Sequence, residues 1–427
     1  MTATTFTVVF LAALAISVGL RLWLARRHVA HVAAHRTAVP LAFAGRVALA
    51  AHQKAADYTM ARTRFGILEM LFDTGVLLAL TLGGVLGAVV AWTGSLPAAP
   101  LWQDLALVAA AGLFASVIAL PFSYWQAFVI EAKFGFNRMT LRLWMADLGK
   151  GLLLATALGL PLAALALWLM RAAGPLWWLW VWAVWIGFQF LVLALYPTLI
   201  APLFNKFSPL PAGAARERIE GLLARCGFAS RGLFVMDGSR RSSHGNAFFT
   251  GFGRGRRIVF FDTLLARLAP DEIEAVLAHE LGHFKLKHVL KRMLWMAALS
   301  LALLALLAWL MDSPWFYEGL GVRPAPGRPG VALILFFLAL PVFTFLLGPL
   351  SSLYSRRHEF EADAFAARHA SGEALSQALV KLYEDNAATL TPDPLYSAYY
   401  DSHPPAAIRV ARLHPAAAAA MAAPATA

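Results

Sequence analysis

The stretch VLAHELGHFKLKH, residues 276–288, holds two histidines and a glutamate in the pattern His-Glu-x-x-His. On a helix, His279 and His283 would lie on one face, one turn apart, so that their imidazoles could share a metal ion. Glu280 would then be close enough to take a proton from an attacking water. The pattern predicts a metal centre for hydrolysis, of the kind that cleaves peptide bonds.

The residues before this stretch predict that it is helical. Pro270, Asp271 and Glu272 fit a helix start, because proline suits the first turn and acids suit the positive end of the helix dipole. An apolar segment begins at residue 289, so the helix is expected to run on into a membrane. With 12 histidines in 427 residues, a chance occurrence of the motif has odds of about one in a hundred. The alternative is a surface helix with ordinary polar side chains, and a third ligand would decide between them.

The composition is that of a membrane protein. Of the 427 residues, 60% are hydrophobic and 14% are charged, and the mean hydropathy is +0.64, too apolar for a soluble protein of this length. A membrane span needs about 20 mostly apolar residues. Seven segments qualify: residues 5–24, 67–92, 105–130, 152–170, 176–199, 289–311 and 331–353. We therefore predict a mostly α-helical, polytopic membrane protein with about seven transmembrane helices.

Lysine and arginine gather in alternate loops between these segments. The basic stretches are residues 26–64, 133–150 and 206–292 and the tail from residue 356. By the positive-inside rule, the N-terminus faces outside, and the catalytic stretch and the C-terminus face the cytoplasm. The net charge of +12 follows from this topology, so we expect a lipid bilayer and no nucleic acid as partner. The excess of arginine over lysine and the abundant alanine are typical of GC-rich genomes and favour a bacterial inner membrane.

The predicted spans divide the chain into five parts. Residues 1–204 form spans one to five, residues 205–288 a cytoplasmic catalytic segment, and residues 289–353 spans six and seven. Residues 354–413 form a C-terminal catalytic segment, and residues 414–427 are a low-complexity tail. In the first catalytic segment, the β-rich runs LFVMD, AFFTG and RIVFFD predict a small antiparallel sheet. An exposed edge strand of such a sheet could bind an extended peptide through main-chain hydrogen bonds.

A third metal ligand is expected just after the seventh span. The only cysteine, Cys226, cannot supply a thiolate cluster, so histidine and carboxylate groups must hold the metal. Glu359 and Asp363 are four residues apart on a predicted helix, and spans six and seven return the chain to the side of the motif. We assign Glu359 as the third ligand and Asp363 as the acceptor of an imidazole N–H. Two residues close to Glu359 in the sequence, His358 and Glu361, are the alternative candidates for the third ligand.

Six motifs together resemble one protein family. They are HELGH (279–283), EFEAD (359–363), SHGNAFFTGF (243–252), SHPP (402–405), FGFNRMT (134–140) and APLFNKFSPL (201–210). Along the chain they run from the third span to near the C-terminus, in the family's order. With these motifs and seven spans, the chain resembles the type I CAAX prenyl endopeptidases, integral-membrane zinc proteases of the gluzincin type. The resemblance implies a helical shell around a large, water-filled chamber in the membrane, with the zinc site on its cytoplasmic side.

The resemblance also implies roles for individual residues. His279, His283 and Glu359 would bind one Zn²⁺ per chain, and Glu280 would be the catalytic base. The resemblance matches His403 and Arg409 to a polar pair near the site, which would stabilise the oxyanion. The strand residues that hold the substrate backbone are matched by Asn246 and Ala247.

Simpler readings stay open for several of these residues. Arg409 could be a structural ion-pair partner of Asp363, His403 an ordinary loop histidine, and Asn246 a turn residue beside a glycine. Two further histidines near the motifs, His244 and His288, receive no role.

The predicted function is a zinc-dependent membrane endopeptidase that acts on CAAX-type or on membrane-associated or misfolded polypeptides. One alternative is a smaller stress-response membrane zinc protease that shares the two metal motifs, but seven spans and the FGFN and FNK motifs argue against it. Another is a metal-binding transporter or a scaffold. Few ionisable residues, such as Glu69 and Asp73, lie in the spans to form a transport path, and an intact Glu280 argues against a scaffold.

Overall fold

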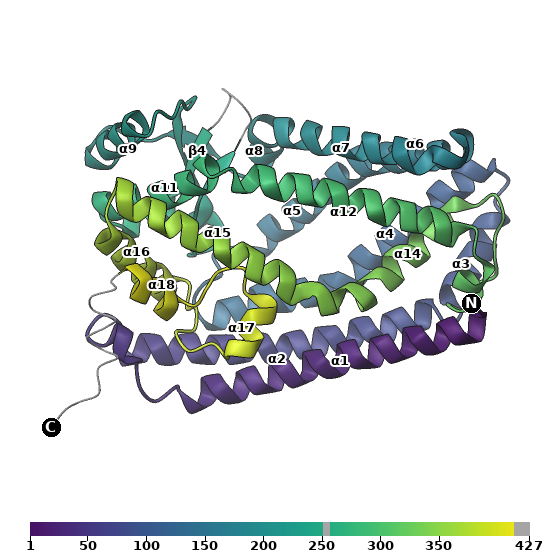
Figure 1. Cartoon of the computed structure of the whole chain (residues 1–427), viewed down its shortest axis with the longest axis horizontal. Coiled ribbons are helices and arrows are strands. Elements are labelled where there is room, and N and C mark those ends of the chain that lie inside the picture. The colour runs from purple at the N-terminus through teal and green to yellow at the C-terminus, as the bar shows by residue number, and fades with distance from the viewer. Residues whose placement is uncertain (251–256, 414–427) are drawn as a thin grey trace.

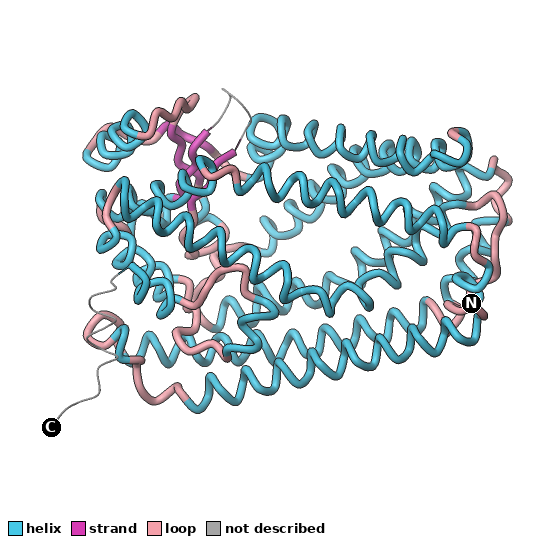
Figure 2. The backbone as a smooth tube through the Cα atoms, viewed as in Figure 1, coloured by secondary structure: helices cyan, strands magenta, loops and turns pink. Residues whose placement is uncertain are grey.

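The computed structural model describes residues 1–250 and 257–413. The end of the SHGNAFFTGF motif and the predicted tail, residues 414–427, lie outside the described residues. Long helices form a bundle, and the strands and most of the short helices gather at the end opposite the N-terminus (Figures 1 and 2). The helices of the bundle are α1 Ala3–Ala34, α2 Leu49–Leu80, α3 Val85–Gly94, α4 Pro100–Trp125, α5 Leu141–Leu154, α6 Leu160–Ala172, α7 Trp177–Leu195, α12 His288–Met311, α14 Pro329–Thr344 and α15 Gly348–His369.

Shorter elements make up the remainder of the described chain. The short helices are α8 Ala201–Phe204, α9 Ala214–Arg225, α10 Asp262–Arg267, α11 Pro270–Lys285, α13 Pro314–Glu318, α16 Gly372–Asp385, α17 Pro394–Tyr400 and α18 Ala406–Leu413. The strands are β1 Phe207–Pro209, β2 Leu233–Met236, β3 Ala247–Thr250 and β4 Arg257–Phe261. Single 3₁₀ or π-helical turns join several consecutive helices, so that α4, α5 with α6, and α7 with α8 are parts of longer continuous rods.

The prediction of about seven membrane-crossing segments is confirmed, with a difference in the second one. Six helical rods in the described chain are long and apolar enough to cross a membrane, and a seventh is formed if α2 and α3 count as one span. These two helices meet at an angle of 51°. The break contains Gly84, whose φ of 79° lies in the left-handed region that glycine adopts at little cost. Residues 67–92 are therefore a bent span and not the straight helix that hydropathy suggests.

The small sheet is mixed, so the prediction of an antiparallel sheet is wrong in one pairing. The strand order is β1-β2-β4-β3. β1 with β2 and β3 with β4 are antiparallel, but β2 and β4 run parallel, with Leu233 opposite Ile258. The long connection between β2 and β4 contains β3, which folds to the outside of β4 and leaves β4 as the neighbour of β2. β3 is consequently an edge strand.

The motif helix α11 does not continue into the membrane, contrary to the sequence-based expectation. It ends at Lys285, and α12 begins at His288. Between them, Lys287 has a φ of 59°, an unusual value for a residue with a side chain. This left-handed residue turns the chain sharply, so α11 and α12 are separate helices.

The helix after the seventh span lies tightly against α11. A Cβ on Gly282, within the HELGH motif, would come within 3.0 Å of the Phe365 Cβ and 3.1 Å of the Ala362 Cα. Glycine at this position therefore lets α11 and α15 approach closely enough for their side chains to meet. The other face of α11 packs into an apolar core formed with α9, α16 and the sheet; its central members include Ile219, Leu222, Phe260, Leu277 and Leu379.

Candidate metal centre

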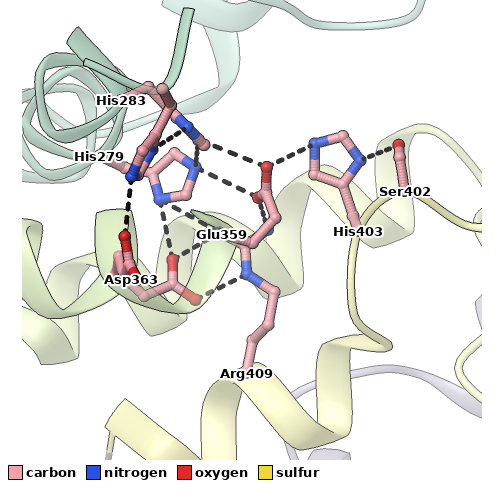
Figure 3. Close-up of polar contacts among 9 residues, drawn as sticks. His279, His283, Glu359, Asp363, Ser402, His403 and Arg409 are labelled. Atoms are coloured by element: carbon pink, nitrogen blue, oxygen red, sulfur yellow. Dashed lines mark hydrogen bonds and ion pairs between the residues drawn. The ribbon is translucent and has the colours of Figure 1, made fainter. Parts of the chain in front are cut away.

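Three side chains from two helices converge on one point, as Figure 3 shows. His279 and His283 come from α11 and Glu359 from α15. The two Nε2 atoms are 3.2 Å apart, and the Glu359 oxygens lie 3.4 Å from His279 Nε2 and 3.3 Å from His283 Nε2. Ligands about 2.0–2.1 Å from a tetrahedral zinc ion lie about 3.3 Å from one another. The donor set therefore has the spacing that such an ion needs.

The electrostatics of this point also fit a cation. Glu359 is only 4% exposed and His279 only 6%. Among the described residues, the Oε2 atom of Glu359 is buried without a hydrogen-bond partner. A buried carboxylate oxygen left in this way is costly unless a positive group compensates it. Two imidazole nitrogens that face each other likewise need a proton or a metal ion between them.

Asp363, one turn after Glu359, lies behind His279. Its Oδ1 atom is 2.9 Å from Nδ1 of His279, so the ring can donate Nδ1–H to the carboxylate and keep the lone pair of Nε2 for a metal. Burial disfavours the charged imidazole, but Asp363 and Glu359 outweigh this effect and raise the pKa of His279 to about 9. In the metal-free protein, a proton thus occupies the place of the cation at neutral pH.

Arg409, from α18, holds Asp363 from the other side. Its Nε and Nη2 atoms donate to the two carboxylate oxygens of Asp363 at 2.9 Å and 2.6 Å. Arg409 is 5% exposed, and its Nη1 atom lies 3.7 Å from Oε2 of Glu359. The ion-pair reading of Arg409 thus describes its main contact, and the same side chain also borders the convergence point.

His403 approaches from the opposite side, on the loop between α17 and α18 (Figure 3). Its Nε2 atom is 3.4 Å from Oε1 of Glu359, and its Nδ1 atom is 3.1 Å from the Ser402 hydroxyl. The side chain is 61% exposed, whereas His279 and Glu359 are buried and His283 is only partly exposed. His403 is therefore placed where it can meet a bound molecule.

A cavity of about 350 Å³ opens beside these residues. It is lined by members of both catalytic segments, among them Asn246, Ala247, His279, Glu280, His403 and Arg409. Asn246 and Ala247 lie at the start of β3, the edge strand, where Asn246 O accepts a hydrogen bond from Phe261 N at 2.9 Å. The structure thus brings the sequence-predicted base and backbone-binding residues to the same cavity as the ligand candidate His279.

A second cavity of about 920 Å³ adjoins the first. Both are bordered by Asn246, Tyr383, Asn386 and His403, and the larger one extends along α1 and α2, where Arg21 and Arg62 line it. It lies where the family resemblance implies a chamber between the membrane helices and the site.

Two residues that border both cavities were missed by sequence reasoning. Asn386, just after α16, has its Oδ1 atom 3.1 Å from His244 Nδ1 and accepts from Gly245 N at 3.3 Å. It therefore supports the loop that leads into β3. Tyr383 borders both cavities. No motif surrounds either residue, so their proximity to the site depends on the packing of α16.

The competing ligand candidates lie elsewhere. His358 and Glu361 form a separate group with His288. Glu361 Oε2 is 2.9 Å from His288 Nε2, and the rings of His358 and His288 stack with centroids 4.0 Å apart. Neither His358 nor Glu361 belongs to the group formed by His279, His283 and Glu359.

A bundle of membrane-crossing helices with a His-His-Glu centre beside an edge strand defines a membrane-embedded metallopeptidase. Residues 28–206 match the family described as "CAAX prenyl protease N-terminal, five membrane helices", and residues 209–417 match "Peptidase family M48". The chain therefore belongs to peptidase family M48, among the CAAX prenyl proteases. The resemblance seen in the sequence motifs is confirmed.

Named relatives agree with this placement along most of the chain. The CAAX prenyl protease 1 homolog of Oryza sativa subsp. japonica is 40% identical over 74% of this chain and 74% of its own length. The human homolog is 31% identical over 83% of this chain and 84% of its own. The crystal structure of S. mikatae Ste24p matches with a TM-score of 0.90 and 30% identity, covering 96% of this chain and 99% of that one.

Proposed function

We propose that this metallopeptidase uses one Zn²⁺ per chain, bound by His279, His283 and Glu359, to cleave peptides delivered from the membrane. The observation that carries the proposal is the convergence of three side chains. The two Nε2 atoms are 3.2 Å apart, and each lies 3.3–3.4 Å from one oxygen of Glu359, a buried carboxylate whose Oε2 atom has no hydrogen-bond partner among the described residues. Two imidazoles and a carboxylate suit zinc and leave a fourth position open.

When bound there, zinc supplies a Lewis acid that polarises the scissile carbonyl. Glu280, on the wall of the adjoining cavity, takes a proton from the attacking water as the water oxygen bonds to the carbonyl carbon. It then passes this proton to the leaving nitrogen as the peptide bond breaks. Asp363, clamped by Arg409, keeps the Nε2 lone pair of His279 directed toward the metal.

His403 is proposed to stabilise the negative charge that develops on the carbonyl oxygen. Its exposed imidazole borders the cavity, and a hydrogen-bond donor aimed at such an oxygen contributes strongly to peptide cleavage. Arg409 is buried and donates its shortest hydrogen bonds to Asp363. It would therefore add positive charge near the carbonyl oxygen without being the main hydrogen-bond donor to it.

The substrate is proposed to bind as an added strand along the outer edge of β3. Its backbone would pair with the main chain at Asn246 and Ala247, which accommodates many sequences because main-chain hydrogen bonds do not depend on the side chains. The relatives are named CAAX prenyl proteases, so lipidated CAAX-type peptides are the first substrate class to consider. Membrane-associated or misfolded polypeptides form the wider class.

The site is proposed to face the cytoplasm of a bacterial inner membrane. The basic loops favour this orientation, and the N-terminus lies at the opposite end of the bundle from the site (Figure 1). We also propose that residues 205–288 and 354–413 act as one catalytic unit. The close approach of α11 and α15 at Gly282 supports this grouping.

The test is cleavage of a quenched fluorescent CAAX-type peptide by detergent-purified protein, with metal analysis of each sample. Wild type is expected to cut and to hold about one zinc per chain. Glu280→Gln should keep the metal and lose about 10²–10⁴-fold in rate. Asp271→Asn, which changes an exposed acid on the same helix, serves as the matched control and should cut like wild type.

Other outcomes would count against the proposal in separate ways. Full activity in Glu280→Gln would remove Glu280 from the mechanism. A metal other than zinc in active protein would overturn the choice of ion. If wild type holds zinc but cuts neither CAAX-type peptides nor unfolded polypeptides, the metal-binding transporter or scaffold becomes the better explanation.

A further inference from the structure

A second group of polar side chains lies directly behind His283, and the mechanism above leaves it without a role. Nδ1 of His283 is 3.1 Å from Nδ1 of His288. Nε2 of His288 is 2.9 Å from Oε2 of Glu361, and Arg357 Nε donates to the other oxygen of Glu361 at 3.0 Å. These contacts form one continuous chain that leads from the metal-ligand candidate to the protein surface.

The chemistry of imidazole allows only one placement of protons along this chain when His283 binds a metal through Nε2. Nδ1 of His283 then carries a hydrogen and donates it. Nδ1 of His288 must accept, so the hydrogen of neutral His288 is on Nε2, which donates to Glu361. Glu361 is an acceptor at both oxygens. Every contact thus pairs one donor with one acceptor, and each is satisfied.

The position of His288 depends on the sharp turn between α11 and α12. His288 is five residues after His283, a spacing that does not bring side chains together on one continuous helix. The left-handed conformation of Lys287 ends α11 and directs the first residue of α12 back over His283. His288 is 4% exposed, so its side of the contact between the two imidazoles is buried.

A second metal site is the other reading of this group, because ligand atoms of His288, His358 and Glu361 lie within 4.8 Å of one another. Imidazole binds a metal in the plane of its ring, about 2.0–2.1 Å from the nitrogen. The rings of His288 and His358 are stacked, with centroids 4.0 Å apart and an interplanar angle of 11°. An ion between them would lie far out of both planes, so this arrangement disfavours shared coordination.

We propose that His288 and Glu361 are positioning residues, which hold His283 in the tautomer and orientation that present Nε2 to the metal. The inference rests on the proposed function in one respect, the assignment of His283 as a metal ligand. It gives the two histidine ligands different supports. Asp363 accepts directly from His279, whereas the carboxylate behind His283 acts through a second imidazole.

The test measures zinc affinity of the full-length protein in detergent by competition with a chromophoric chelator. His288→Leu removes the acceptor and should weaken zinc binding about 10–100-fold, as loss of a residue that supports a ligand typically does. His288→Asn restores an acceptor near the position of Nδ1 and should recover part of this loss. Glu361→Gln changes a partly exposed side chain and should weaken binding by a smaller factor.

The matched control is His358→Leu, which removes the stacked imidazole from the same pocket without touching the chain of hydrogen bonds. It should bind zinc within about twofold of wild type, well below the loss expected for a supporting residue. The visible spectrum of the cobalt-substituted protein adds a second readout. His288→Leu should change the cobalt bands, and His358→Leu should leave them as in wild type.

Each result separates this inference from the proposed function. Unchanged zinc affinity in folded His288→Leu and Glu361→Gln would overturn the positioning role, even if wild type cleaves peptides. Two zinc ions in wild type, one of which is lost in both His288→Leu and His358→Leu, would establish the second metal site instead. The expected pattern of affinities would support the positioning role even if no peptide were cut.

Discussion

Two buried carboxylates, at opposite ends of the bundle, differ in how their oxygens are used. Asp104, near the start of α4, is completely buried. Its oxygens accept from Arg328 at 2.8 Å, Arg171 at 2.6 Å and the Gly330 amide at 3.0 Å. Glu359, at the other end, keeps one oxygen without a hydrogen-bond partner among the described residues.

This difference separates the Asp104 cluster, which holds helices together, from the Glu359 site, which can bind a cation. The two arginines around Asp104 also donate to backbone oxygens, including those of Val90, Pro100 and Gly327, so the cluster ties α3, α4, α6 and the start of α14 together. A carboxylate with both oxygens hydrogen-bonded to protein donors, like that of Asp104, has little capacity left for a ligand. An incompletely paired one, facing two imidazole nitrogens, has capacity for a cation.

Removing the negative charge of Glu359, the incompletely hydrogen-bonded carboxylate, should have the largest effect on function. Glu359→Gln keeps the size of the side chain but loses a metal ligand. Loss of a supporting residue alone typically costs 10–100-fold in metal affinity, so we expect a loss of more than about 100-fold and no peptide cleavage. Chelator competition and the peptide assay measure both. Near-normal zinc affinity would contradict the assignment of Glu359.

Replacing the hydrogen-bonded carboxylate of Asp104 by an amide should lower stability instead. Asp104→Asn leaves two arginines inadequately paired and should cost about 3–5 kcal/mol of unfolding free energy, measured by denaturant titration in detergent. Zinc content at low temperature should stay normal. The control is Asp57→Asn, at a partly exposed pair with Arg36, for which about 0–1 kcal/mol is expected. Equal losses in the two variants would remove the contrast.

In the metal-free protein, the pH dependence of stability should distinguish the end of the bundle that holds His279 from the end that holds Asp104. The pKa of His279 rises from 6.5 to about 9 in the folded state, so its stabilising contribution is complete below pH 6.5 and disappears as the pH rises through 9. This amounts to about 3 kcal/mol at most.

Zinc-loaded protein should not show this loss of stability, because the metal replaces the proton. The destabilisation caused by Asp104→Asn should also stay constant between pH 6.5 and 9, since the described side chains that hydrogen-bond within the Asp104 cluster are those of aspartate, arginine and threonine, and none is a histidine. Unfolding titrations of metal-free and zinc-loaded protein at several pH values measure both effects. A metal-free protein that becomes more stable over this range would contradict the sign.

A smaller effect is expected from crowding the Asp104 cluster. A Cβ on Gly330 would lie 2.9 Å from the Cβ and Cγ atoms of Asp104. Gly330→Ala should therefore destabilise the protein by about 1–3 kcal/mol, the usual cost of overpacking. Gly149→Ala is the control, because nothing lies within 4 Å of its added Cβ and alanine favours helices. A stabilised Gly330→Ala variant would show that the cluster can relax.

Local spacing explains which parts of the site could be predicted. His279 and His283 follow from helical periodicity, and Glu359 with Asp363 from the same periodicity plus the return of the chain through two spans. His403 and Arg409 came only from the family resemblance, since single polar residues in loops and short helices carry no periodic signal. The resemblance also supplied Asn246 and Ala247, and their position on an edge strand required the actual order of strands.

Other features could not be read from local patterns. Hydropathy averages over about 20 residues, so it does not detect the bend between α2 and α3 or the break at Lys287. The three-residue strand β1, Phe207–Pro209, is too short for an alternating pattern. The parallel pairing of β2 with β4 depends on where the connecting segment folds.

By itself, the sequence determined that this protein crosses the membrane and that α11 and α15 each present candidate metal ligands at helical spacing. Both follow from short-range rules, namely apolar length and 3.6 residues per turn. Only the tertiary structure decided that both oxygens of Asp104 are hydrogen-bonded while one oxygen of Glu359 has no such partner among the described residues. It also decided that His288 contacts His283 and that His358 stacks on His288. These outcomes depend on atoms brought together from distant parts of the chain, where differences of less than an ångström determine which hydrogen bonds form.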